Sequence, residues 1–280
     1  MSSVIKSQKT AITVLKKICD NFLNSQGKIR PHCIISGQSG TGKSYLLERL
    51  AASLGIHVLN VNAAQITREG ISGNSLSKAL EPLKKLQGKP VIVFMDEFDK
   101  LFLGVDGRTG DERSGVQSEI LHIISSGVCQ VIADYGHYHE LNTKNCLFMF
   151  AGAFQGIEEL NPDRLMQLGM YPELIGRVNL HVALPSIDCD DLIKAMKKDP
   201  LLQHYFNTHN ISDSTKQKEV QDVIASQIVK HFDTNVIGYR LITRLIHQYF
   251  IYDGVFPEYK DAETLEIEKA ISECEISFGD

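Results

Sequence analysis

Apolar and polar positions follow two different periods along this chain. From Ala11 to Phe22 the apolar residues recur every three or four positions, which predicts an amphipathic helix over residues 8–24. Beyond it, short apolar or β-branched runs alternate with further helical patterns, and this alternation predicts a parallel sheet with helices on both faces. The predicted strands are Cys33–Ser36, His57–Val61, Val91–Met95, Cys146–Phe150 and Leu180–Leu184, and the helices between them are Lys43–Leu54, Ser75–Leu86, Gly115–Ser126 and Ile157–Leu168.

The alternation is interrupted twice and then stops. The polar, glycine-rich segment Gly104–Ser114 predicts a loop, and Val128–Asn142 predicts an inserted β-hairpin. After Pro185 all patterns are helical, so we expect an α/β domain over residues 1–185 and a small helical domain over residues 186–280. The helices expected in the second domain are Asp188–Lys198, Thr215–Phe232, Tyr239–Tyr252 and, more weakly, Ala262–Cys274.

Composition narrows the class of protein. The 280 residues are 43 % apolar and 22 % charged, which is typical of a folded chain with a sizeable core. The net charge of −5 argues against a surface that neutralises nucleic-acid phosphates, although it is compatible with a local basic pore. Six scattered cysteines form no Cys-x-x-Cys pair, which favours reduced thiols over a disulfide framework or a zinc site. With no apolar run of about 20 residues and no signal peptide, we expect a cytoplasmic protein without a membrane partner.

A phosphate-binding loop follows the first predicted strand. Its pattern, G-x-x-x-x-G-K-[ST], is expected about 0.01 times by chance in a chain of this length and composition. The backbone N–H groups of such a loop face phosphate oxygens, its lysine contacts the β- and γ-phosphates, and its serine hydroxyl can bind Mg²⁺. The predicted nucleotide-binding residues are Gly37, Gln38, Ser39, Gly40, Thr41, Gly42, Lys43 and Ser44.

Two adjacent carboxylates end the third predicted strand. Asp96 follows the apolar run Val91–Met95 and so lies at the carboxyl edge of the sheet, where open α/β folds bind ligands. We expect Asp96 to interact with the Mg²⁺ and Glu97 to orient or deprotonate an attacking water. The pair predicts ATP hydrolysis rather than transfer of the phosphoryl group to a metabolite.

Several further blocks resemble the AAA+ ATPases, and in particular the ClpX/HslU branch of protein unfoldases. The resemblance extends from about Val4 to Tyr252 and is carried by Asp96-Glu97-Phe98-Asp99-Lys100, Ser114-Gly115-Val116-Gln117, Phe148–Phe154 and Gly169–Arg177. It implies an α/β fold with a P-loop AAA+ module, in which a five-stranded parallel sheet flanked by helices precedes a small all-helical lid. ATP and Mg²⁺ are the implied cofactors.

The resemblance also implies roles for residues outside these motifs. Arg177 matches the arginine finger that reaches the ATP of a neighbouring subunit, and Arg240 matches the sensor-2 arginine of the lid. Val4 and Ile5 resemble the apolar pair near the adenine ring, and helix-edge packing is the alternative for them. Ile71 stands in Gly70–Gly73, at the place of the aromatic residue that grips a threaded polypeptide, and a plain surface turn is the alternative there.

Other family features are missing from this sequence. The chain begins where the ATPase module begins, so we expect no zinc-binding N-domain. Only Gln155–Leu168 separates the fourth strand from the block that ends at Arg177, which is too short for a peptidase-docking loop. We therefore expect no partner peptidase.

These observations lead to three hypotheses. The first is an ATP-hydrolysing homo-oligomeric ring, in hexameric form, that remodels, unfolds or disassembles a protein partner. The second is a nucleic-acid motor or helicase loader, which the acidic net charge disfavours. The third is a nucleotide-controlled assembly switch with slow turnover.

Overall fold

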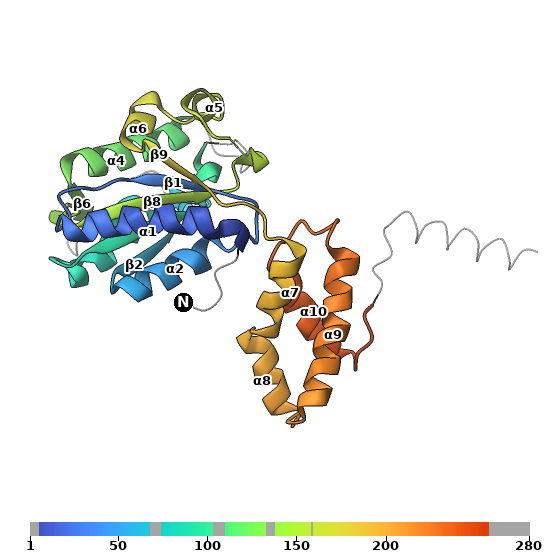
Figure 1. Cartoon of the computed structure of the whole chain (residues 1–280). Helices are drawn as coiled ribbons and strands as arrows, with labels where there is room; N and C mark the ends of the chain where they lie inside the picture. The colour runs from blue at the N-terminus through green and yellow to red at the C-terminus, as the bar shows by residue number, and fades with distance from the viewer. Residues whose placement is uncertain (1–5, 68–73, 103–109, 133–137, 158, 258–280) are drawn as a thin grey trace, which may run out of the picture. The chain divides into compact units, whose positions relative to one another are not determined.

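Five parallel strands form the central sheet, as the sequence predicts. A computed structural model describes residues 6–67, 74–102, 110–132, 138–157 and 159–257 (Figure 1). The order across the sheet is β2-β5-β8-β1-β9. The bounds are β1 Cys33–Ser36, β2 His57–Asn62, β5 Val91–Asp96, β8 Cys146–Gly152 and β9 Leu180–Ala183.

Both faces of this sheet are covered by helices. The apolar stripe of α1 (Lys9–Asn24) and the buried residues of α2 (Lys43–Leu54) pack on one face, where Ile92 and Phe94 of β5 point. Val91, Val93 and Met95 of the same strand point to the opposite face. Because side chains alternate along a strand, an all-apolar strand requires cover on both sides. The helices on that opposite face are α3 (Leu76–Leu80), α4 (Gly110–Ser126), α5 (Pro162–Gln167) and α6 (Pro172–Arg177).

Two predicted helices are shorter than expected, and α4 is longer. The helix predicted over Ser75–Leu86 is α3 followed by the 3₁₀ segment η3 (Glu81–Leu86), because Pro82 lacks the N–H that an α-helix needs. The predicted helix Ile157–Leu168 begins only at Pro162, where the Asn161 side chain accepts from Arg164 N at 2.9 Å. Residues 110–114 of the predicted loop belong to α4.

Small elements complete this part of the chain. The predicted hairpin is confirmed, with β6 (Val128–Ile132) antiparallel to β7 (Tyr138–Asn142). A short parallel pair joins β3 (Ile66–Thr67) to β4 (Asn74–Ser75). The remaining 3₁₀ turns are η1 (Lys6–Gln8), η2 (Ala63–Gln65), η4 (Phe98–Leu101) and η6 (Phe154–Gly156).

The contacts divide the chain into two compact units. The sheet-bearing unit contains Met1–Leu192 together with Thr234–Tyr239, and the second unit contains Ile193–Asp233 and Arg240–Asp280. The sequence places the boundary near residue 185, whereas the contact-based division adds residues 186–192 and the connecting segment 234–239 to the first unit.

Helices are the regular elements of the second unit in its described residues. Helix α7 (Cys189–Lys197) leads into it, followed by α8 (Pro200–Thr208), α9 (Ser214–His231) and α10 (Arg240–Ile251). The rings of Tyr205 on α8 and Phe250 on α10 stack with centroids 4.4 Å apart. Helix α8 was not predicted, although Asp199 caps it by accepting from Leu201 N at 2.8 Å and Pro200 opens it.

The structure describes five of the six cysteines and also bears on whether a helix could span a membrane. Cys19, Cys33, Cys129 and Cys146 are buried cysteines in the reduced form, and Cys189 is a reduced, partly buried one. Burial raises the pKa of Cys19 to about 12, with Asp20 adding to the shift, so this thiol stays protonated and unreactive. Among the described helices, none combines the length and the apolar character needed to cross a bilayer.

His32 makes the stability of the sheet-bearing unit depend on pH. Burial, aided by Arg30, lowers the pKa of His32 to about 4, and its Nδ1 accepts from Phe148 N at 3.0 Å. In the unfolded chain this ring titrates near pH 6.5, so the unfolded chain binds more protons between pH 6.5 and pH 4. The free energy of unfolding therefore falls by roughly 3 kcal/mol across that window as the pH decreases.

Urea unfolding at pH 7, 6, 5 and 4 measures this effect. We expect His32→Gln to have a lower free energy of unfolding at pH 7 and a flatter dependence on pH than the parent chain. His204→Gln, which alters an exposed histidine on α8, keeps the parental slope. Equal slopes for His32→Gln and the parent chain would contradict this assignment.

Candidate active site

The phosphate-binding loop connects β1 to α2, as predicted. Gly40 and Gly42 have φ values of 77° and 84°, which residues with a Cβ rarely adopt. Gly42 directly precedes the first residue of α2, so the positive end of the helix dipole faces the space that the loop encloses. The local backbone therefore has the form that an anion-binding loop requires.

Donors from Lys43 and from the first turn of α2 bind three carbonyl oxygens of this loop. The Lys43 ammonium donates to the carbonyl oxygens of Gly37 at 2.6 Å and Gln38 at 3.0 Å. The Gly42 carbonyl accepts from Leu46 N at 2.8 Å, as in a regular helix. A carbonyl oxygen that accepts from a protein donor is held in one orientation, so these contacts fix the conformation of the loop.

Two further carbonyls are bound by residues far away in the sequence. Gln8, which is 1 % exposed, donates through Nε2 to the carbonyl oxygens of Thr41 at 2.9 Å and Pro185 at 3.0 Å. Tyr239 N donates to the Gly40 carbonyl at 2.8 Å. The loop is thus fixed from outside by the residue before α1 and by the segment before α10.

Gly40 and Gly238 meet backbone to backbone. A Cβ on Gly40 would overlap the carbonyl of Ile237, and a Cβ on Gly238 would lie 2.6 Å from the carbonyl of Gly40. Gly238 also has a φ of 56°, so both positions require glycine. Because Thr234–Tyr239 belongs to the sheet-bearing unit, this contact lies within one unit.

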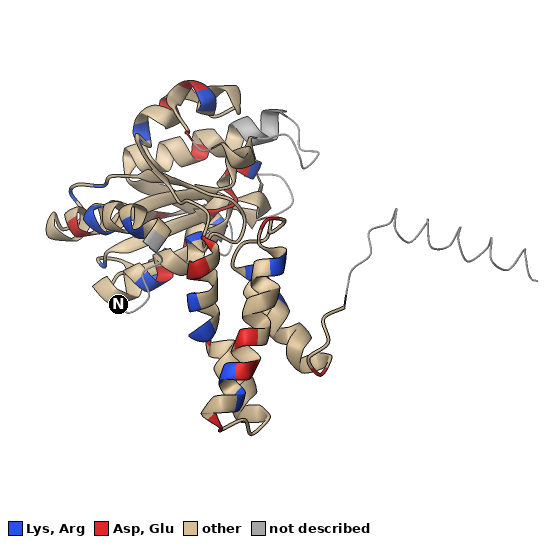
Figure 2. Ribbon diagram, turned by 45° about the vertical axis from the view of Figure 1, so that its right-hand side comes forward, with Lys and Arg blue, Asp and Glu red and all other residues tan. Residues whose placement is uncertain are grey.

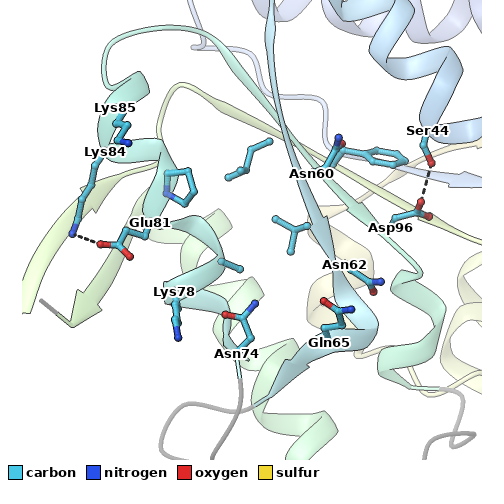
Figure 3. Close-up of a pocket in the computed structure, with 15 residues that line it drawn as sticks. Ser44, Asn60, Asn62, Gln65, Asn74, Lys78, Glu81, Lys84, Lys85 and Asp96 are labelled. Carbon is cyan, nitrogen blue, oxygen red and sulfur yellow. Dashed lines mark hydrogen bonds and ion pairs between the residues drawn. The ribbon is translucent and has the colours of Figure 1, made fainter.

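Ser44 and Asp96 meet at the end of the loop. The Ser44 hydroxyl donates to Oδ2 of Asp96 at 2.8 Å (Figure 3). Glu97 N donates to Oδ1 of Asp96 at 2.9 Å. The pairing of β2 with β5 places Asn62 opposite Asp96. A hydroxyl and a carboxylate are hard oxygen ligands of the kind that Mg²⁺ binds, so this pair fits a magnesium ion.

Glu97 has an unusual backbone conformation. Its φ is 55°, and its side chain is exposed at the start of η4. A positive φ is uncommon outside glycine and is often found at functional sites. The turn ends β5 at Asp96 and leaves Glu97 at the same edge of the sheet.

Asp99, the third acid of this block, has a structural role. It is 2 % exposed and accepts from Phe154 N at 3.0 Å, which fixes the turn after β8. A Cβ on Gly152 would lie 2.5 Å from Oδ1 of Asp99, so the end of β8 has no space for a side chain.

His181 also lies close to the start of the loop. Its Nε2 and the hydroxyl of Ser36, the residue before Gly37, are 2.7 Å apart. Burial lowers the pKa of His181, so this ring is neutral at pH 7. His181 therefore adds no positive charge beside the loop, whereas Lys43 contributes one within it.

The structure places Arg177 away from the side of the sheet that carries α2. Arg177 is the exposed last residue of α6, and α6 packs on the opposite face of the sheet from α2. Its guanidinium makes no hydrogen bond or ion pair with the described residues of its own chain. Arg240 is the exposed first residue of α10 in the second unit.

Three predicted site residues, Val4, Ile5 and Ile71, lie outside the described residues. In contrast, sequence reasoning missed Gln8 and Tyr239. Gln8 continues the buried stripe of α1 at Ala11 and Leu15, so a polar residue at an apolar position is the signal that could have identified it. For Tyr239 N, a backbone donor, the sequence carries no signal.

Comparisons with known proteins agree with this geometry. The family "ATPase family associated with various cellular activities (AAA)" matches residues 33–165. Curated relatives named "ATP-dependent Clp protease ATP-binding subunit ClpX" are similar over most of the chain. The protein from Bacteroides fragilis is 26 % identical over 86 % of this chain and 70 % of its own length. Those from Porphyromonas gingivalis and Treponema denticola are 26 % and 24 % identical, over 90 % and 86 % of this chain and 72 % and 69 % of their own lengths.

This chain is similar to the ClpX ATPases over most of its length and matches the AAA family of ATPases over residues 33–165. The family match begins at the first residue of β1 and includes the whole phosphate loop, Asp96 and Glu97. For this ATPase, the backbone N–H groups of the loop and the Lys43 ammonium fit the triphosphate of ATP.

Gln8 positions the phosphate loop of this ATPase, and its removal tests that role. We expect Gln8→Ala to raise the KM for ATP about fivefold to tenfold, because the Thr41 carbonyl loses its donor and is free to turn toward the phosphates. We expect kcat to change less than KM, since no reacting group is removed.

Gln117→Ala is the matched control. Gln117 is 2 % exposed and also bonds to two backbone groups, Gly169 O at 3.0 Å and Tyr171 N at 2.9 Å, but it contacts no residue of the loop. Steady-state kinetics with ATP should show an unchanged KM for this variant. A similar rise in KM for both variants would show that Gln8 acts through general stability alone.

Proposed function

We propose that this ATPase works as a hexameric ring in which Arg177 completes the ATP site of the neighbouring protomer. The observation that carries the proposal is the exposed Arg177 guanidinium at the end of α6, without a described partner and on the face of the sheet opposite to α2. A finger supplied in trans stabilises the charge that develops on the transferring phosphoryl group, with an effect of ~10³–10⁵ on the rate. Hydrolysis then depends on assembly.

Each remaining residue of the site has a role in the proposed mechanism. The backbone N–H groups of Gly37–Ser44 and the Lys43 ammonium bind the β- and γ-phosphates. Ser44 and Asp96 bind a magnesium ion, which supplies charge neutralisation on the phosphate oxygens when bound. Glu97, exposed beside Asp96, orients a water molecule and accepts its proton as the water attacks the terminal phosphorus. Arg240 contacts the nucleotide from the helical domain, residues 186–280.

We further propose that the ring remodels, unfolds or disassembles a protein partner in the cytoplasm. The relatives are named as ATP-binding subunits of a Clp protease, which supports a protein as the partner. In this chain the interval Gln155–Leu168 includes the end of η6 and the short α5, which leaves little room for a peptidase-docking loop. We therefore propose a remodelling activity that does not deliver its partner to a peptidase.

Stimulation of ATP hydrolysis tests this function. We expect an unfolded protein to raise the steady-state ATPase rate of the assembled chain severalfold, because the substrate of a remodelling motor couples to its turnover. Single-stranded DNA and RNA should leave the rate unchanged. Stimulation by nucleic acid alone would identify a nucleic-acid motor or loader, and stimulation by neither would favour a slow assembly switch.

A Glu97→Gln variant provides the control for this experiment. It keeps the shape of Glu97 and removes its ability to accept a proton, so ATP binding remains while turnover falls at least 10²-fold. With ATP it should retain an unfolded protein through size-exclusion chromatography, whereas Lys43→Ala should not. Adding a Clp-type peptidase to the parent chain tests the remaining claim, because degradation of the unfolded protein would contradict a peptidase-independent activity.

A further inference from the structure

A cavity of about 930 Å³ lies beside the Ser44–Asp96 pair (Figure 3). It follows β2, one of the two edge strands of the sheet, and reaches α3 and η3. Ser44 and Asp96 line one end, where the phosphate loop places the terminal phosphate of a bound nucleotide. The cavity therefore begins at two residues of the proposed ATP site.

The lining of this cavity offers hydrogen-bond donors. Gln65, Asn74, Lys78 and Lys85 line it and make no hydrogen bond or ion pair through their side chains with the described residues. Asn62 adds its amide N–H₂ group, because its Oδ1 already accepts from Ala64 N at 2.9 Å. Figure 3 shows Asn62 beside Gln65 and Lys78 beside Asn74.

Some charged side chains of this lining form an ion pair with a neighbour, and others do not. Lys84 pairs with Glu81 at 3.2 Å, so these two charges compensate each other. Lys78 and Lys85 are exposed and uncompensated by any described carboxylate. At the other end, Asp96 interacts with Ser44 and with the proposed magnesium ion. The uncompensated lysines Lys78 and Lys85 thus give their part of the cavity a positive charge.

We propose that this cavity receives the orthophosphate that ATP hydrolysis releases, and that Lys78 and Lys85 bind this anion on its way to solvent. Hydrolysis forms a bond between the water oxygen and the terminal phosphorus and breaks the bond between that phosphorus and the bridging oxygen, which leaves with ADP. Because a water molecule occupies about 30 Å³ in the liquid, the cavity has space for the product with a hydration shell. Exposed lysines bind a hydrated anion weakly and in a salt-dependent way, which suits passage rather than storage.

This inference rests on the ATPase activity and on the placement of the terminal phosphate at Ser44 and Asp96, and it is independent of the protein partner. Inhibition of the basal ATPase rate by added sodium phosphate, measured at constant ionic strength, therefore tests it. In Lys78→Glu/Lys85→Glu we expect the inhibition constant for phosphate to rise about fivefold or more, because two attractive charges become repulsive. Inhibition by ADP, which binds through the phosphate loop, stays unchanged.

Lys28→Glu/Lys89→Glu is the matched control. It changes the net charge by the same amount at two exposed lysines of the same unit that do not line the cavity. This control should show the parental inhibition constants for both phosphate and ADP. The proposal is overturned if phosphate inhibits all three proteins equally, or if phosphate does not inhibit the parent chain. A failure to respond to unfolded protein would instead concern the proposed partner and would leave this measurement intact.

Discussion

Phosphate binding by a backbone loop depends on where its carbonyl oxygens point. Each peptide unit carries both a donor and an acceptor, so N–H groups can face an anion only if the carbonyl oxygens turn away and find other partners. In this chain the partners of five such carbonyls, those of residues 37, 38, 40, 41 and 42, are Lys43, Tyr239, Gln8 and Leu46. The geometry of the nucleotide site thus depends on contacts outside the motif as much as on the motif itself.

This dependence links distant parts of the sheet-bearing unit. Gln8 bonds to the loop and to Pro185 after β9, and Tyr239 bonds to the loop just before α10. Gly238 and Gly40 approach closely enough that neither position accepts a Cβ. A change in the loop backbone on nucleotide binding would therefore change the hydrogen bond of Tyr239 N to the Gly40 carbonyl. The residue after Tyr239 is Arg240, which we propose to contact the nucleotide.

The sequence predicted the sheet well because each of its strands is a local feature. The apolar runs at Val91–Met95 and Cys146–Phe150 predict strands that are buried on both faces of the sheet, and in the structure helices cover both faces. Short helices that begin with proline, such as α6 and α8, were missed because they span few turns and show little periodicity. The two external donors to the loop were missed for a different reason. Gln8 and Tyr239 are distant in the sequence from Gly37–Ser44, and only the folded chain brings them to it.

The central claim of the proposed mechanism is that one protomer binds the triphosphate while the next supplies the missing positive charge. Mixing Lys43→Ala with Arg177→Ala chains tests it most directly, because each chain alone lacks one half of every site. With random assembly of equal amounts in a ring, the account predicts that ATP hydrolysis returns to about a quarter of the parental rate, the share of interfaces with an intact loop facing an intact finger. A mixture no more active than its separate components, or an Arg177→Ala chain that alone turns over ATP at the parental rate, would contradict it.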